Sequence, residues 1–136
     1  MPDTPPPLSG VHHVALSVGD VHGSAEWYAR ILGFELLRAA PQETFDRLVL
    51  RHPDTPLLLT LVAHRDVHHD RFDETRTGLD HLAFRAGSAE DVEAWRRWLE
   101  TQDVRCSEVK DGALPASRLI TFRDPDGIQV ECYWSP

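Results

Sequence analysis

The chain has 136 residues and a formal net charge of −8 at pH 7, with 41% hydrophobic and 26% charged residues. This composition is typical of a compact domain with its own core, and no apolar run approaches the roughly 18 residues needed to cross a membrane. The acidic balance argues against nucleic acid as the main partner, because phosphate binding needs a basic surface. Cys106 and Cys132 are too few for a disulfide framework, so we expect a cytoplasmic protein.

The first half of the chain reads as one strand, one helix and three more strands. Residues 1–10 are rich in proline and lack the basic and long apolar segments of a signal peptide, so we interpret them as a flexible leader. Alternation over 11–18 predicts a strand. Asp20 is a helix N-cap residue type, and the apolar positions after it predict a helix to about Leu32, stopped by Gly33. Three further strands are expected at 34–39, 45–51 and 57–63.

The second half repeats this order. The strand residues Val11–Leu16, which contain His13, return as Leu79–Phe84, which contain His81, and Trp27 aligns with Trp95. Ser88 is the equivalent helix cap, for a helix to about Gln102. Strands are expected at 79–85, 104–109, 117–123 and 128–134, with a turn at Asp124–Gly127.

A repeat of this kind indicates a duplicated structural unit. The sequence therefore predicts an α+β fold of two βαβββ units, with mixed sheets and the helices outside. We expect one domain over 11–136, with unit one at about 11–63, a polar linker at 64–77 and unit two at about 78–136.

Alternation along three of the strands places two histidines and a glutamate away from the core. His13 lies opposite the apolar residues of its strand, and His81 does the same in the second unit; Glu131 lies on the corresponding face of the last strand. Two imidazoles and one carboxylate suit a divalent metal: Fe²⁺, Mn²⁺, Zn²⁺, Co²⁺ or Ni²⁺. Single residues of these types are common on exposed sheet faces, but the repeated position of the histidines favours a site.

These residues lie in segments that resemble the vicinal oxygen chelate superfamily, which includes glyoxalase I, fosfomycin-resistance enzymes, extradiol dioxygenases and bleomycin-resistance proteins. The segments that carry the resemblance are His13–Asp20, Trp27–Phe34, Gly78–His81 and Asp124–Glu131. The resemblance implies paired βαβββ units whose curved sheets enclose a metal, with His13, His81 and Glu131 as its ligands. It also implies a homodimer in which the two chains share each site.

The function implied is that of a metal-dependent enzyme acting on a small oxygenated molecule, by isomerase, lyase or dioxygenase chemistry. The alternative is a non-catalytic protein that binds a drug or metabolite, as bleomycin-resistance proteins do. Glyoxalase I usually adds a glutamate ligand from a strand that here reads 57–62 and offers only Thr60. Extradiol dioxygenases have a tyrosine where this chain has Thr121, and they have a histidine before it that the stretch 111–117 lacks.

Other polar residues carry weaker hypotheses. Tyr133 shares the face of Glu131 and is a candidate hydrogen-bond donor to a substrate, although packing is the commoner role. Some arginines are candidates for binding an anionic substrate or, more simply, solvated strand residues: Arg47, Arg51, Arg118 and Arg123. The linker holds His64, His68, His69 and Asp70 and is interpreted as a solvated linker, a loop over the cavity or a second metal site. Neither cysteine is expected to act as a nucleophile.

Overall fold

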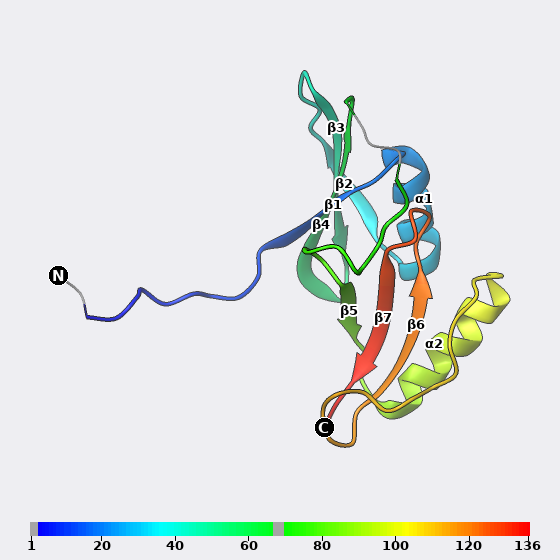
Figure 1. Cartoon of the computed structure of the whole chain (residues 1–136). Helices are drawn as coiled ribbons and strands as arrows, with labels where there is room; N and C mark the ends of the chain where they lie inside the picture. Colours follow the sequence, from blue (N-terminus) through cyan, green and yellow to red (C-terminus); the bar gives the residue numbers. More distant parts are fainter. Residues whose placement is uncertain (1–2, 67–69) are drawn as a thin grey trace. The chain divides into compact units, whose positions relative to one another are not determined.

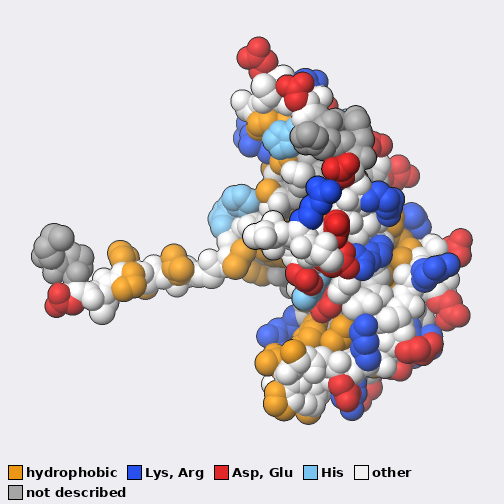
Figure 2. Space-filling model, viewed as in Figure 1, with side chains coloured by type: hydrophobic (Ala, Val, Ile, Leu, Met, Phe, Trp, Pro, Cys, Tyr) orange, Lys and Arg blue, Asp and Glu red, His pale blue; other side chains and the backbone are white. Residues whose placement is uncertain are grey.

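The computed structural model describes residues 3–66 and 70–136 (Figure 1). The chain divides into two compact units, Met1–Val67 and His68–Pro136. Residues 3–12 lie outside any helix or strand and are exposed, and Figure 1 shows them extending away from the first strand. No described helix is long and apolar enough to cross a membrane. Lys and Arg side chains are interspersed with Asp and Glu over the visible face in Figure 2, unlike the basic stripe typical of nucleic-acid binding.

The first unit is a four-stranded sheet with one helix. Its elements are β1 (His13–Ser17), α1 (Val21–Leu32), β2 (Glu35–Ala39), β3 (Phe45–His52) and β4 (Thr55–His64). The strand order is β1-β4-β3-β2, with β1 parallel to β4 and the other pairs antiparallel. The Asp20 side chain accepts a hydrogen bond from the His22 N–H, and Gly33 ends the helix in the left-handed conformation at φ 84°. Both predicted helix boundaries are confirmed.

The second unit repeats the arrangement with three strands. Its elements are β5 (His81–Arg85), α2 (Ala89–Thr101), β6 (Arg118–Arg123) and β7 (Gln129–Trp134), in the order β5-β7-β6. As in the first unit, the strand that precedes the helix pairs in parallel with the last strand. Ser88 caps α2 as predicted, with its hydroxyl accepting from the Asp91 N–H. The helix packs against β6 and β7, so one face of this sheet is covered and the other carries the polar residues.

The strand predicted at 104–109 is wrong in extent. This segment makes only isolated bridges, between Cys106 and Phe122 and between Lys110 and Leu119. The cause lies at Ser107, whose hydroxyl accepts a hydrogen bond from the Thr121 N–H at 3.0 Å, in the place of a backbone carbonyl. The second unit is therefore βαβββ-like, with its third sequential strand reduced to bridges.

The core positions follow the predicted alternation. In β1, Leu16 is buried while His13, Ala15 and Ser17 are exposed. In β7, Val130 and Cys132 are fully buried on the helix side. The expected separation of core and polar faces is confirmed for these strands, and it leaves His13, His81 and Glu131 opposite the helices.

Candidate functional site

The register of the second sheet places Glu131 at the centre of its polar face. Glu131 on β7 lies between Ala83 on β5 and Thr121 on β6. The turn before β7 is held by the Asp124 carboxylate, which accepts from the Asp126 and Ile128 N–H groups at 2.9 Å each. This turn fixes where β7 begins and therefore fixes the position of Glu131 along the strand.

His81 and Glu131 come together across β5 and β7. The His81 Nε2 atom lies 3.6 Å from the Glu131 Oε2 atom. The Glu131 side chain is only 8% exposed, whereas that of His81 is 39% exposed, so the carboxylate is buried and the imidazole lies at the surface. Of the three predicted ligands, these are the two that the second unit supplies.

The remaining polar atoms of the pair are already bonded. His81 Nδ1 lies 2.6 Å from Asp80 Oδ1, and because a carboxylate only accepts, Nδ1 donates. In the neutral imidazole this leaves the lone pair on Nε2. Glu131 Oε1 accepts from Gln129 Nε2 at 3.0 Å, and Oε2 accepts no hydrogen bond within residues 3–66 and 70–136. With a neutral imidazole, two atoms with lone pairs therefore face each other.

This donor set fits a divalent cation. Two atoms bound to one ion at about 2.1 Å lie roughly 3.0–3.4 Å apart for angles between square and tetrahedral. The observed 3.6 Å is within a few tenths of an ångström of that range. The contact from Asp80 to the far nitrogen of His81 is also the one that orients most histidine ligands in metal sites.

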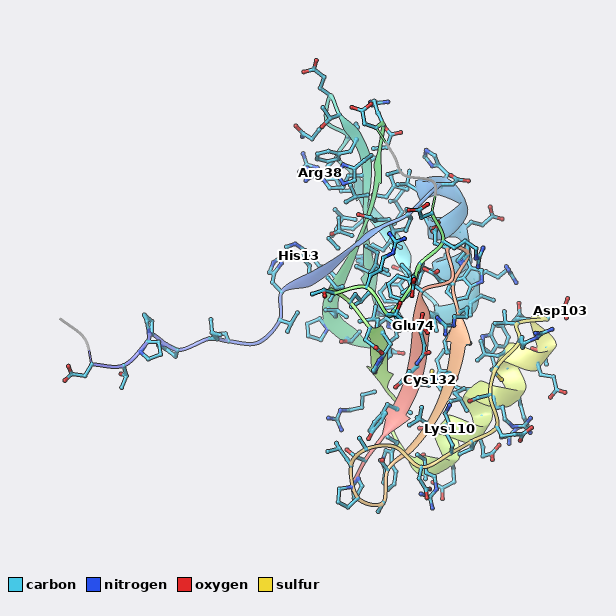
Figure 3. The ribbon with its side chains drawn as sticks, in the orientation of Figure 1. His13, Arg38, Glu74, Asp103, Lys110 and Cys132 are labelled. Atoms are coloured by element: carbon cyan, nitrogen blue, oxygen red, sulfur yellow. The ribbon has the colours of Figure 1, made fainter. Side chains whose placement is uncertain are left out.

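His13 lies at the start of β1 in the first unit, where it is exposed (Figure 3). Its Nδ1 is 2.9 Å from His12 Nδ1, so in both units the preceding residue contacts Nδ1 of the repeated histidine. Within residues 3–66 and 70–136, no three His, Cys, Asp or Glu side chains are gathered as a metal site. The structure thus brings together His81 and Glu131, and His13 as a third ligand stays a prediction.

Tyr133 has a partner in the loop 111–117. The Leu114 N–H donates to the Tyr133 hydroxyl at 3.2 Å. A Cβ atom added to Gly112 would lie 2.6 Å from that same hydroxyl oxygen and 2.6 Å from Ser117 Oγ, so the loop packs closely on the tyrosine. This contact supports the packing role, and a role toward a substrate stays a prediction.

The arginines considered as anion binders all have partners. Arg51 pairs with Glu35 at 3.3 Å, and Arg118 pairs with Asp111 at 2.6 Å. The other two bind a carbonyl or a carboxylate: Arg47 Nε donates to Ala40 O, and Arg123 pairs with Glu74 at 2.8 Å. These contacts account for the four arginines as strand residues bonded to their neighbours, with no need for a bound anion.

Of the predicted linker, residues 70–77 belong to the second unit (Figure 3). Glu74 accepts two hydrogen bonds from the Arg123 guanidinium, which lowers the pKa of its carboxyl, and the Phe72 N–H donates to Asp126 O at 3.0 Å. Asp70 pairs with Arg76 at 3.6 Å, whereas the His64 ring meets that of Phe45 edge to face in the first unit. His68 and His69 lie outside the described residues.

The cysteines are unreactive by environment, as expected. Burial raises the pKa of the Cys132 thiol to about 12 and also raises the pKa of Cys106. Both thiols are therefore protonated at neutral pH and are poor nucleophiles.

Two residues of this face were not found from the sequence. Asp80 was not recognised as the partner of His81. The sequence did contain a signal, since this acidic residue directly precedes the second copy of the repeated histidine. Arg85, on the same face of β5, was also missed, because nothing in the sequence distinguishes it from the paired arginines.

Comparison with known proteins agrees with this architecture. Residues 10–132 match the model of the Glyoxalase/Bleomycin resistance protein/Dioxygenase superfamily. The chain belongs to this superfamily. A crystal structure of a glyoxylase/bleomycin resistance protein/dioxygenase domain from Frankia sp. EAN1pec is 33% identical with a TM-score of 0.85, covering 96% of this chain and 100% of that one.

Two further relatives have more specific names. The metallothiol transferase FosB of Staphylococcus haemolyticus is 26% identical over 126 residues, covering 93% of this chain and 84% of FosB. A variant of the fosfomycin resistance protein FosX of Listeria monocytogenes, in complex with Mn(II) and a dihydroxypropylphosphonic acid, is 17% identical. Its TM-score is 0.69, with 93% of this chain and 90% of that chain covered, and at this identity the likeness concerns the fold alone.

Proposed function

We propose that this protein is a divalent-metal-dependent enzyme that acts on a small oxygenated molecule. The observation that carries the proposal is the His81–Glu131 pair, in which Nε2 and Oε2 face each other at 3.6 Å while their other polar atoms are bonded elsewhere. His13, the repeat equivalent of His81, is the proposed third ligand. FosB, a metallothiol transferase by name and 26% identical over 126 residues, supports the metal.

A bound divalent ion with open positions would polarise substrate oxygens and stabilise negative charge that develops on them. The chain's own residues prepare that position. Asp80 holds the His81 ring in one orientation, and Gln129 holds the Glu131 carboxylate. Ala83, directly beside Glu131, carries only a methyl group and leaves room for a substrate next to the ligands.

Metal content tests the proposal. Untagged protein purified without added metal should contain about one Fe²⁺, Mn²⁺, Zn²⁺, Co²⁺ or Ni²⁺ per chain by mass spectrometry, or should take one up when metal is added. His81→Ala and Glu131→Ala should lose the metal. His22→Ala, an exposed histidine at the start of α1, is the matched control and should keep it.

The metal found would direct the choice of assay: iron toward oxygen chemistry, and zinc, nickel or manganese toward isomerase or transferase chemistry. If the protein takes up none of the five ions, the enzyme proposal is wrong as stated. A small-molecule binder would then be the function to test, by ligand screening without metal.

We also propose that the active form is a homodimer in which each site combines ligands from two chains. Leu36 and Leu37 are 59% and 49% exposed on the edge strand β2, where an unpaired backbone and apolar side chains favour association. Chains carrying His13→Ala can be refolded together with chains carrying both His81→Ala and Glu131→Ala. Shared sites would restore about a quarter of the metal in a random mixture, because each mixed C₂ dimer regains one intact site. Sites within one chain would restore none.

A further inference from the structure

Two arginines lie on the polar face of the second sheet, Arg85 and Arg123. Arg85 ends β5, where it is exposed, and its side chain makes no hydrogen bond or ion pair within the described residues. Arg123, on the same face of β6, is held by Glu74.

The strand register places Arg85 beside the proposed metal ligands. Arg85 pairs with Tyr133, and the next pair on the same face is Ala83 with Glu131. Successive residues on one face of a strand lie about 7 Å apart, a span that an arginine side chain can cross. Ala83 does not obstruct that path. Lys110 lies in the same row, opposite Leu119, whereas Arg85 is the cation on β5, the strand that carries His81.

We propose that Arg85 binds an anionic group of the substrate, a carboxylate or a phosphonate, separate from the oxygens that bind the metal. This inference rests on the proposed function, since it places the anion relative to the metal. A guanidinium gives two parallel hydrogen bonds to such a group and is less strongly hydrated than an ammonium. The substrate class is thus narrowed to small oxygenated acids whose anion lies a few bonds from the chelating oxygens.

Two hydroxamate chelators, one with and one without a carboxylate, test this. Acetohydroxamate binds a metal through two oxygens and carries no other charge, whereas succinate monohydroxamate has the same chelating group with a carboxylate two methylenes away. Protein loaded with Mn²⁺ should bind the second chelator about tenfold more tightly, or better, as expected for a charge-assisted hydrogen bond. Affinities are measured by titration calorimetry.

Two variants test whether Arg85 causes the preference for the chelator that carries a carboxylate. Arg85→Gln should reduce the ratio of the two affinities to about one without changing Mn²⁺ affinity or the affinity for acetohydroxamate, and Arg85→Lys should keep part of the preference. Arg97→Gln is the matched control, because Arg97 is exposed on α2 and should leave the ratio unchanged.

Different results would overturn the role of Arg85 and the proposed function. A ratio near one in the natural protein, or a preference that survives Arg85→Gln, overturns the role of Arg85 while the metal site stands. Absence of Mn²⁺ uptake, followed by the paramagnetic resonance signal of the free ion, together with absence of uptake of the other four ions, overturns both the proposed function and the inference.

Discussion

Replacing Tyr133 with phenylalanine separates its two possible roles, an anchor for the loop 111–117 or a donor to substrate. The change deletes one hydroxyl and leaves the ring in place. The hydroxyl accepts one hydrogen bond, from the Leu114 N–H at 3.2 Å, and Leu114 is exposed. A typical hydrogen bond contributes about 0.5–1.5 kcal/mol, and water can replace this one in part, so we expect a loss of about 0.5–1 kcal/mol in the free energy of unfolding.

Urea unfolding followed by tryptophan fluorescence measures that loss, and hydrogen exchange at the Leu114 amide should be faster in the variant. Gly112→Ala probes the same contact from the other side. Its Cβ would lie 2.6 Å from both Tyr133 Oη and Ser117 Oγ, so overpacking should cost about 1–3 kcal/mol. Unchanged stability and exchange in Tyr133→Phe, together with weaker binding of acetohydroxamate to the Mn²⁺ form, would refute the anchor role and assign the hydroxyl to the substrate.

Three further changes have defined outcomes. Asp80→Asn should weaken Mn²⁺ binding about 10–100-fold, because the amide orients His81 less strongly; equal affinity would show that Asp80 does not position the ligand. Arg123 lowers the pKa of Glu74, so their pairing stabilises the fold above the ordinary glutamate pKa and is lost as pH falls through the lowered value. The difference in urea midpoint between the natural protein and Glu74→Gln should therefore shrink on acidification, and a constant difference contradicts this. Burial raises the pKa of Cys132 to about 12, so its thiol should react with Ellman's reagent only in urea. For the same reason the free energy of unfolding should decline as pH rises above the ordinary thiol pKa. Rapid labelling of Cys132 in the native protein contradicts this.

Most of the secondary structure was predictable because it depends on local residues and on the repeat. The Asp20 and Ser88 caps and the Gly33 stop lie at the boundaries of their helices, where short side chains and a left-handed glycine are required. Each half of the chain also supported the interpretation of the other, since the same order of elements was expected twice. Local signals of this kind do not depend on the remainder of the fold.

The segment 104–109 shows where local pattern was insufficient. Its residues have the composition of a strand, but Asp103 before it adopts φ 57° and the Ser107 hydroxyl replaces a backbone acceptor opposite Thr121. A side chain that competes with the ladder is visible only once the partner strand is in position. Alternation predicts which face a residue takes if a strand forms, and not whether the strand is continuous.

The same alternation that selected His81 and Glu131 also places Arg85 on their face, yet the sequence offered no reason to single it out. On that face Arg85 differs from Arg123 in having no carboxylate partner within the described residues, and partners are set by contacts between distant segments, such as Glu74 with Arg123, 49 positions apart. Ligand positions can therefore be inferred from strand parity and a repeat, because both are properties of the sequence. Whether an arginine is available to bind a substrate depends on which cations already have carboxylate partners. Those ion pairs are known only once the chain has folded.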